Sequence, residues 1–261
     1  MEFLLSIYTD QFLVFLLVLA RVSGLVAIAP MFSSQAIPGR VRAFVAIGIS
    51  LIITPLWWHT PVAVPENVID LAILVASEFA IGLSLGLAVM ICFVGIDLAG
   101  ETLGQMTGMR LANTASPDYN ASMSVFSQFL HMLMLAVFLI AGGYRYLLDV
   151  FFQIFERMPP GRAQMSMQVV EALTEILGYS FALGVKLAAP IVLVLMLSLL
   201  VMSLIGRTMP QFNVLAVGFG VNSLVMLGAC LLSLGILVRV FQDQSFRAID
   251  LLSPVFGTSP S

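Results

Sequence analysis

Five ionisable residues lie inside or at the edges of long apolar stretches: Arg21, Glu78, Asp97, Glu101 and Lys186. An ionised side chain at the centre of a membrane-spanning helix costs about 2.5 to 3.5 kcal/mol on insertion scales, so these groups should not face lipid without compensation. They could form an ion or proton path, or they could pair between helices or subunits and fix an assembly. Because their signs are mixed and they lie on several segments, pairing is favoured.

Asp97 and Glu101 are four residues apart and would share one face of a helix, where like charges repel unless a cation intervenes. A proton relay could use such a pair, and a partner such as an arginine from elsewhere would explain it equally well. Lys186 is followed four residues later by Pro190, which cannot donate to the carbonyl of residue 186. We therefore expect a kink beside this lysine, which suits a transporter site or a helix bent around a neighbour.

Catalytic and metal-binding patterns are scarce. His59 and His131 are isolated in the sequence, and Cys92 and Cys230 both lie inside apolar stretches. The chain has neither the H-E-x-x-H spacing of zinc proteases nor a glycine-rich loop ending in Lys-Ser or Lys-Thr. We predict no enzyme activity, no catalytic residue, no cofactor and no metal site.

Glycines recur at a spacing of four at Gly82 and Gly86, and again at Gly100, Gly104 and Gly108. Small residues at this spacing let two helix backbones approach closely. The sequence therefore predicts packing seams, which could receive a helix of this chain or of a partner subunit.

The connection at about 101–124 is rich in Ser, Thr, Asn, Ala and Gly and is broken by Pro117. Met106, Met109 and Met123 bracket it. Methionine gives flexible apolar contact, as a soft gasket that must part for a passenger would require.

The elements that must position these residues are apolar helices. The chain has 261 residues, of which 60% are hydrophobic and 10% charged, and its mean hydropathy is +1.07. Soluble domains carry about 25% charged residues, so this is a membrane protein. Its formal charge of −3 offers no basic surface for nucleic acid.

A bilayer core about 30 Å thick needs about 20 apolar residues in a helix. Six segments meet this requirement, at about 11–31, 41–58, 68–100, 125–143, 176–206 and 212–238. We predict an all-α polytopic membrane protein of six long apolar helices. The third and fifth segments exceed one span, so tilted, broken or protruding helices are expected there.

The longest connections are 101–124 and 144–175. The second holds an amphipathic stretch at 144–157 and a break at 158–161, and it is expected at an interface or between two halves. Arginines in the connections divide five against four between the two sides and do not orient the chain. This weak bias suggests that partner subunits set the final position.

The segment Arg21–Arg42, RVSGLVAIAPMFSSQAIPGRVR, resembles the opening signature of the FliR family, the R component of the flagellar type III export gate. Its pattern is R-x-x-small, then P-x-(F/L), then I-P-x-x-(V/R)-(R/K). Three further stretches agree in order: Glu78 with Gly82 and Gly86; Asp97-x-x-Gly100 leading to Met109; and Arg207-Thr-Met-Pro210-Gln211-x-Asn213 ending at Gly218-Phe219. The resemblance covers essentially the whole chain.

The resemblance implies a non-enzymatic subunit of the gate through which unfolded flagellar subunits leave the cell. The family's R protein is similar in shape to a fusion of the P and Q subunits, and its hairpin-like helices assemble helically with them. Expected partners are FliP-type, FliQ-type, FlhB-type and FlhA-type components, export substrates and membrane lipid. The expected location is the bacterial inner membrane, within the flagellar basal body.

In this reading residues 1–261 form one export-gate domain. It divides into N-terminal helices with a plug loop (1–143), an interface connection (144–175) and a C-terminal helical hairpin with a tail (176–261). The family's plug maps to about 104–128. Where family plugs are often aromatic, this chain has Leu111 and Thr114. The candidate plug residues are Met106, Met109, Leu111, Met123 and Phe126.

Bends are expected at Pro190, Pro210, Gly218 and Gly220. The family tends to read Gly-Phe-Pro near the last helix, and this chain has Gly220 in place of that proline, which permits a bend without fixing it. We expect gating by packing, in which an export substrate displaces the plug, while the buried charges serve as assembly contacts.

Two alternatives remain. The same family serves virulence injectisomes, which the sequence separates only weakly from flagellar use. An independent small-solute transporter with a site at Lys186, Glu78 and Asp97 would be expected to show inverted repeats. None is convincing between 1–143 and 144–261.

Overall fold

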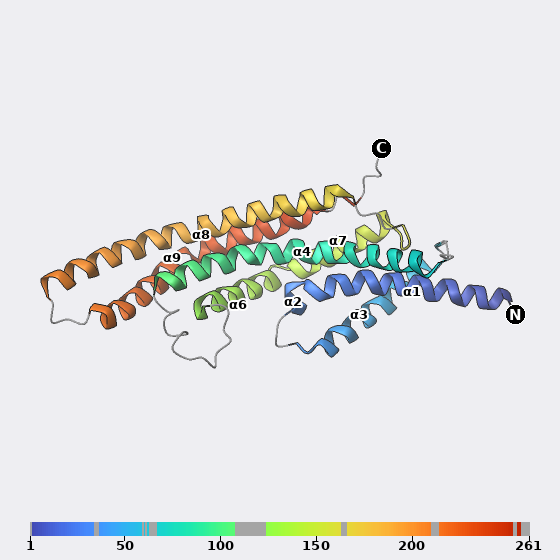
Figure 1. The fold of residues 1–261 in the computed structure, drawn as a ribbon, viewed down its shortest axis with the longest axis horizontal. Coiled ribbons are helices and arrows are strands. Elements are labelled where there is room, and N and C mark those ends of the chain that lie inside the picture. The colour runs from blue at the N-terminus through green and yellow to red at the C-terminus, as the bar shows by residue number, and fades with distance from the viewer. Residues whose placement is uncertain are drawn as a thin grey trace. The chain divides into compact units, whose positions relative to one another are not determined.

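The computed structural model describes residues 2–33, 37–58, 60, 62, 67–107, 124–162, 166–209, 214–252 and 255–256. Its helices are α1 (Glu2–Ile28), α2 (Pro30–Ser33), α3 (Gly39–Ile53), the 3-10 turn η1 (Thr54–Trp57), α4 (Val68–Met106), α6 (Val125–Ile140), α7 (Gly143–Arg157), α8 (Met167–Thr208) and α9 (Val214–Leu252). Figure 1 draws them as ribbons. Strands are absent from these described ranges, and the predicted all-α class is confirmed.

Five described helices are long and apolar enough to cross a membrane, and there are six spans if α6 and α7 form one broken span. The predicted number of apolar helices is therefore confirmed. The helix ends differ from the prediction. α8 begins at Met167, ahead of the predicted start near residue 176, and α9 continues to Leu252, beyond the predicted end near 238. Backbone hydrogen bonds carry a helix past the point where its apolar character stops.

Three of the long helices exceed a single span: α4 and α8, as predicted, and also α9, which has 39 residues. α4 has 39 residues and α8 has 42, which correspond to about 60 Å at a rise of 1.5 Å per residue. Both are continuous helices, and α8 stays helical through Pro190. We predicted tilted, broken or protruding helices here. Residues 68–106 and 167–208 contain no break.

Contacts gather into two compact units that alternate along the sequence. The first comprises residues 1–91, 142–177 and 245–261, and the second comprises 92–141 and 178–244. In the first unit, α7 turns Leu147, Phe151, Ile154 and Phe155 into the core at a spacing of three to four residues, which is the inward face of the predicted amphipathic stretch.

The core of the second unit centres on Phe93 of α4. Its ring centroid lies 6.0 Å from that of Phe138 on α6 and 5.1 Å from that of Phe241 on α9, both in edge-on geometry. In the same unit α8 and α9 lie side by side, and Ser198 of α8 donates to the side-chain oxygen of Asn222 of α9 at 2.8 Å. These aromatic contacts and the hydrogen bond between Ser198 and Asn222 help to hold the helices of this unit together.

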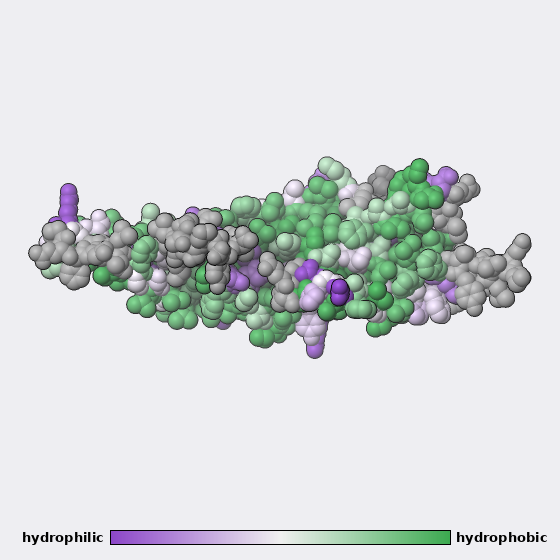
Figure 2. Space-filling view, turned by 60° about the horizontal axis from the view of Figure 1, so that its bottom comes forward, coloured by the Kyte–Doolittle hydropathy of each residue, from purple (hydrophilic) through white to green (hydrophobic). Residues whose placement is uncertain are grey.

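The apolar helices differ in how much of their surface the chain itself covers. In their most apolar stretches, 56% of residues of α1 and 61% of α4 are buried, against 17% for α8 and 22% for α9. Figure 2 shows hydrophobic residues, in green, over much of the visible described surface. Apolar surface of this extent requires lipid or another protein to cover it.

Candidate functional site

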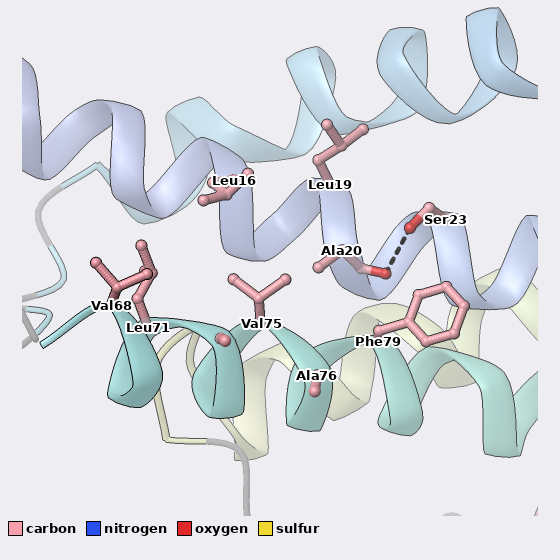
Figure 3. Close-up of a pocket in the computed structure, with 10 residues that line it drawn as sticks. Leu16, Leu19, Ala20, Ser23, Val68, Leu71, Val75, Ala76 and Phe79 are labelled. Atoms are coloured by element: carbon pink, nitrogen blue, oxygen red, sulfur yellow. Dashed lines mark hydrogen bonds between the residues drawn. The ribbon is translucent and has the colours of Figure 1, made fainter.

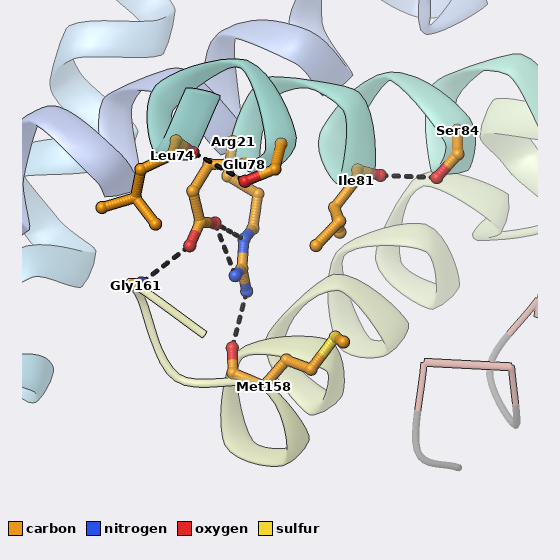
Figure 4. Close-up of polar contacts among 8 residues, drawn as sticks. Arg21, Leu74, Glu78, Ile81, Ser84, Met158 and Gly161 are labelled. Carbon is orange, nitrogen blue, oxygen red and sulfur yellow. Dashed lines mark hydrogen bonds and ion pairs between the residues drawn. The ribbon is translucent and has the colours of Figure 1, made fainter. Parts of the chain in front are cut away.

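The first predicted charge, Arg21, forms a fully buried ion pair with Glu78 (Figure 4). Arg21 Nε donates to Glu78 Oε2 at 2.6 Å, and Arg21 Nη2 lies 2.5 Å from the same oxygen. Both side chains have an exposed fraction of 0%. The pair joins α1 to α4. Each ion gives the other the opposite charge that a buried ion requires.

The turn that follows α7 completes this network. Arg21 Nη1 donates to the carbonyl of Met158 at 2.9 Å, and the Gly161 N–H donates to Glu78 Oε1 at 2.8 Å. The guanidinium carbon also lies 4.3 Å from the centroid of the Phe155 ring. Because Met158 ends α7, the cation sits at the negative end of that helix, where it is stabilised. The predicted break at 158–161 therefore supplies two backbone partners to the ion pair.

Glycines allow α1 and α4 to touch backbone to backbone beside this ion pair. A Cβ on Gly82 would overlap the carbonyl oxygen of Arg21, and one on Gly24 would overlap that of Phe79. A Cβ on Gly86 would lie 3.1 Å from the carbonyl oxygen of Leu25. The R-x-x-small part of the opening signature is thus explained, since Arg21 contacts Glu78 and Gly82 while Gly24 lies against the Phe79 carbonyl.

The other two predicted carboxylates join α4 to α6. Asp97 Oδ1 lies 2.8 Å from His131 Nδ1, and Glu101 Oε1 accepts a hydrogen bond from the backbone N–H of Ser124. Among the described residues, no contact joins Asp97 and Glu101 to one shared cation. Each carboxylate has its own partner on α6, which offsets the expected repulsion. His131, isolated in the sequence, is the functional candidate that sequence reasoning missed.

Gly100 and Gly104 lie on α4 next to these contacts. A Cβ on Gly100 would be 2.6 Å from Ser127 Cα, and one on Gly104 would be 2.5 Å from Ser124 Oγ. The Ser127 hydroxyl donates to the Asp97 carbonyl at 3.1 Å. The structure therefore places two of the three glycines of this predicted seam against α6 of the same chain, and Gly108 lies outside the described residues.

The candidate plug residues are only partly described. Gly108, Met109, Leu111 and Met123 lie outside the described residues. Met106 is half-buried at the end of α4. Phe126 is buried in α6 with its ring centroid 6.4 Å from that of Phe129. Because α4 ends at Met106 and α6 begins at Val125, both ends of the expected 104–128 loop are helical.

The remaining predicted residues that the structure describes have no printed bond to either polar network. Lys186 and Pro190 are exposed on α8. Gly218 and Gly220 lie within α9, where an added Cβ would meet nothing within 4 Å, and the helix continues through both. Pro210 is outside the described residues. In the part of the chain that the structure describes, Glu78 pairs with Arg21 and Asp97 pairs with His131, and neither pair includes Lys186.

A further close contact, between α4 and α8, was not predicted. The Gly95 N–H donates to Ser180 Oγ at 3.0 Å, and a Cβ on Gly184 would lie 2.5 Å from the Gly95 carbonyl oxygen. Ser180 and Gly184 are four residues apart, so the small-residue spacing that revealed the other seams also marks this one.

The spacing G-x-S-x-G, which marks the nucleophile of α/β-hydrolases, occurs at Gly82–Gly86. That chemistry needs the serine on a strand-to-helix turn. Ser84 is instead buried in the middle of α4, where its hydroxyl donates to the Ile81 carbonyl at 2.7 Å. Among the described residues there is also no cluster of three His, Cys, Asp or Glu that could hold a metal.

A groove between α1 and α4 has a volume of about 590 Å³ (Figure 3). Ten residues line it: Leu16, Leu19, Ala20, Ser23, Val68, Leu71, Ala72, Val75, Ala76 and Phe79. Its one hydroxyl, on Ser23, donates to the Ala20 carbonyl at 2.8 Å. Ligand sites combine apolar walls with a few converging polar groups, which these residues do not provide.

The fold and these contacts define a multi-span helical membrane protein whose buried polar groups hold helices together. Residues 12–248 match the family model described as bacterial export proteins, family 1, and the chain belongs to this family. The predicted resemblance is thereby confirmed.

Curated relatives match over nearly their whole length. The flagellar biosynthetic protein FliR of Caulobacter vibrioides is 28% identical over 91% of this chain and 94% of its own. FliR of Escherichia coli is 27% identical over 93% of this chain and 92% of its own. FliR of Bacillus subtilis is 26% identical over 96% of this chain and 98% of its own.

Proposed function

We propose that this chain is a non-enzymatic subunit of the flagellar type III protein export gate. The observation that carries the proposal is the match of the bacterial export family over residues 12–248, together with relatives named FliR that align over nearly their whole length. The structure supports it, because the four charged residues Arg21, Glu78, Asp97 and Glu101 each bind a group of another helix or of its cap, as helix packing requires.

The proposed mechanism is gating by packing. The connection after α4 closes the channel until an arriving unfolded substrate displaces it. Phe126 is buried in α6, so we expect the seal to depend mainly on Met106, Met109, Leu111 and Met123. Methionine and leucine suit this role because they seal by apolar contact and can repack.

Partners are proposed from the same family membership. We expect FliP-type and FliQ-type subunits to contact the chain, with FlhB-type and FlhA-type components nearby, in the inner membrane at the flagellar basal body. The thinly covered apolar faces of α8 and α9 support contact with such subunits or with lipid. Arg21 and Glu78 satisfy each other inside the chain, so their part in assembly is to fix α1 on α4, while exposed Lys186 is free to meet a neighbour.

The decisive experiment is deletion of the gene followed by complementation with a tagged chain. We expect the deletion strain to lose flagella and export, and the tagged chain to bring P-type and Q-type subunits down from solubilised membranes, as identified by mass spectrometry. A chain that purifies alone and transports a small solute in reconstituted vesicles would establish the transporter alternative instead.

The plug assignment has its own test. Changing Met106, Met109 and Leu111 together to Ser should raise ion leakage through the assembled gate, measured as proton entry into cells after an external acid pulse. Met167→Ser, at an exposed position that begins α8, is the control and should not leak. Unchanged conductance in the triple variant would refute the plug assignment.

Flagellar use is favoured over a virulence injectisome because the relatives compared are named as flagellar proteins. Flagellar structural genes beside this gene would agree with that choice. Restored export of a virulence effector, with no effect on motility, would reverse it.

A further inference from the structure

The outward face of α3 is apolar along its whole length. The helix packs on α1 through its other side, where Ala46, Ser50 and Ile53 are buried. Figure 1 shows the two helices side by side. No exposed residue at 43–57 has a polar side chain. The large exposed side chains of α3 and η1 are Val41, Phe44, Ile47, Leu51, Ile52, Leu56 and Trp58.

The two hydroxyl groups of this segment bond to its own backbone. Ser50 donates to the Ala46 carbonyl at 2.7 Å, and Thr54 donates to the Ser50 carbonyl at 2.6 Å. Hydrocarbon accepts no hydrogen bond, so a helix that faces lipid must satisfy its polar groups internally. An interface between two proteins instead carries about one hydrogen bond per 100 to 200 Å². The outward face of α3 therefore fits lipid better than it fits another protein.

The two ends of this face carry residues that favour a membrane surface. Arg40 is exposed one turn before Phe44 on the same side of the helix, since residues four apart are neighbours. At the opposite end Trp58 is 47% exposed. Arginine beside a span and tryptophan at the boundary between lipid and water are both typical of membrane helices.

The distance between these ends matches a bilayer. The candidate span from Gly39 to Trp57 has 19 residues, or about 28 Å at the rise of an α-helix. The hydrocarbon core of a bilayer is about 30 Å thick. Arg40 and Trp58 would thus lie near opposite surfaces of the core, with the apolar face between them.

Arg40 lies at the end of α3 where a positive charge is unfavourable. The first turn of α3 has no acidic residue, and the start of a helix carries the positive end of its dipole. A phosphate group beside Arg40 would offset both positive charges. The phosphate of an anionic phospholipid lies at this depth, and its acyl chains extend along the same side as Phe44.

The other candidate spans differ from α3 in cover or in length. The chain itself covers most of the apolar stretches of α1 and α4, whereas only 22% of the α3 span is buried. α8 and α9 have 42 and 39 residues, about twice the length that crosses a bilayer core. α3 alone among the described spans combines thin cover with the length of one crossing.

We propose that the outward face of α3 is a lipid-binding surface that stays in contact with the bilayer in the assembled protein. The phosphate of an anionic phospholipid pairs with Arg40, and its acyl chains cover Phe44, Ile47 and Leu51. Trp58 anchors the opposite end at the other surface. This contact requires no export substrate and is therefore independent of the proposed function.

The first test is photo-crosslinking in cells that carry the assembled complex. Phe44→p-benzoylphenylalanine places a photoreactive ring on the outward face. After illumination, we expect mass spectrometry of the purified chain to find a peptide that carries the mass of a phospholipid. A crosslink to another protein would instead appear as a shifted band on a gel.

Phe152→p-benzoylphenylalanine is the matched control. Phe152 of α7 is also an exposed aromatic residue, at 41%, but exposed Asp149 and Glu156 lie three and four residues away on the same side. We expect no phospholipid adduct there. Crosslinking of Phe44 to a protein without any lipid adduct, or equal lipid adducts at both positions, would overturn the proposal.

The second test concerns the phosphate. One basic side chain near an anionic surface strengthens binding by about fivefold. Arg40→Gln, combined with the photoreactive group at position 44, should lower the ratio of phosphatidylglycerol to phosphatidylethanolamine adducts by about that factor. Arg40→Lys keeps the charge and should keep the ratio. A ratio that is unchanged in Arg40→Gln would refute the pairing with phosphate.

A third test needs no photoreactive residue. Trp57 and Trp58 are the two tryptophans of the chain, so its intrinsic fluorescence reports on this end of α3. In phospholipid vesicles, bromine atoms near the headgroups should quench the full-length chain more than bromine atoms near the bilayer centre. Trp58→Phe should lose most of this quenching, because Trp57 is half-buried. Equal quenching at both depths would contradict the anchor.

The lipid contact and the export function fail separately. If deletion of the gene leaves motility and export intact while Phe44 still crosslinks to lipid, only the proposed function is wrong. If the deletion abolishes export while Phe44 crosslinks to protein alone, only the lipid contact is wrong.

Discussion

Arg21 is an arginine with no exposed surface in a protein that is 60% hydrophobic. It is retained there by a carboxylate on α4, a carbonyl at the end of α7 and an aromatic ring. Taking such an ion out of water is expensive, and removal of one member of a buried pair leaves the other uncompensated. The network is therefore more sensitive to a single truncation than to the replacement of both ions.

The prediction at this scale concerns Glu78→Leu. It strands Arg21 and should destabilise the chain by about 3 to 5 kcal/mol, seen as a lower level of protein in membranes and a lower melting temperature in detergent. The double variant Arg21→Met with Glu78→Leu should recover most of that loss. Ser77→Ala, which removes a hydroxyl bonded only to the Leu74 carbonyl of its own helix, is the control.

If Glu78→Leu accumulated as well as Ser77→Ala, the ion pair would contribute little to stability. A Glu78→Gln chain that assembled fully yet lost export would indicate a role in proton transfer. The sequence analysis favoured ion pairing over that role.

At the scale of elements, the crossing of α1 and α4 depends on glycines that face each other's backbone. Gly24 meets the Phe79 carbonyl and Gly82 meets the Arg21 carbonyl, so neither position tolerates a side chain without separating the helices. Separation would also stretch the hydrogen bonds between Arg21 and Glu78. Packing and charge thus reinforce each other on one face of α4.

We predict that Gly82→Ala destabilises the protein by about 1 to 3 kcal/mol or more, as overpacking does. Gly48→Ala in α3 is the matched control, because an added Cβ there meets nothing within 4 Å and alanine favours a helix by up to about 1 kcal/mol. Thermal unfolding of both variants in the same detergent measures the difference. Equal melting temperatures would mean that the helices do not cross here as described.

The sequence predicted most of the elements and pointed to residues of α4 that make close contacts, without their partners. Apolar length identified the helices, and a spacing of four marked Gly82 and Gly100. It failed at helix ends, since α8 and α9 continue into polar sequence. It also failed for His131, whose partner Asp97 is 34 residues away. A contact between residues so far apart in the sequence leaves no periodic trace, so only the three-dimensional arrangement reveals it.

At the scale of the whole molecule, basic residues mark both ends of an uncharged stretch of α8. Residues 187–206 contain no ionisable side chain and are flanked by Lys186 and Arg207. About 20 helical residues extend about 30 Å, the thickness of a bilayer core. Long basic side chains at the ends of such a stretch can reach toward polar surroundings. Lipid or a neighbouring apolar subunit would suit the faces between them.

We therefore predict that Leu197→Arg, at a position 63% exposed, lowers recovery of the chain in membranes and in complexes, because a charge in the middle of this stretch costs about 2.5 to 3.5 kcal/mol. Glu171→Arg, on an exposed polar position of the same helix outside the stretch, should be tolerated. Quantitative blotting of membranes and pull-downs compares them. Equal recovery would place Leu197 in contact with water.

The spacing of the Arg21 contacts along the chain also sets an order in time. Glu78 follows Arg21 by 57 residues and Met158 follows it by 137. At a synthesis rate of about 5 to 20 residues per second, the arginine waits roughly 3 to 11 seconds for its carboxylate and roughly 7 to 27 seconds for its carbonyl. Each newborn chain therefore passes through an interval with an unpaired cation in its first helix, when insertion factors can hold it and proteases can reach it. Synthesis of Glu78 on α4 ends that interval, and the carbonyl that follows α7 is added later.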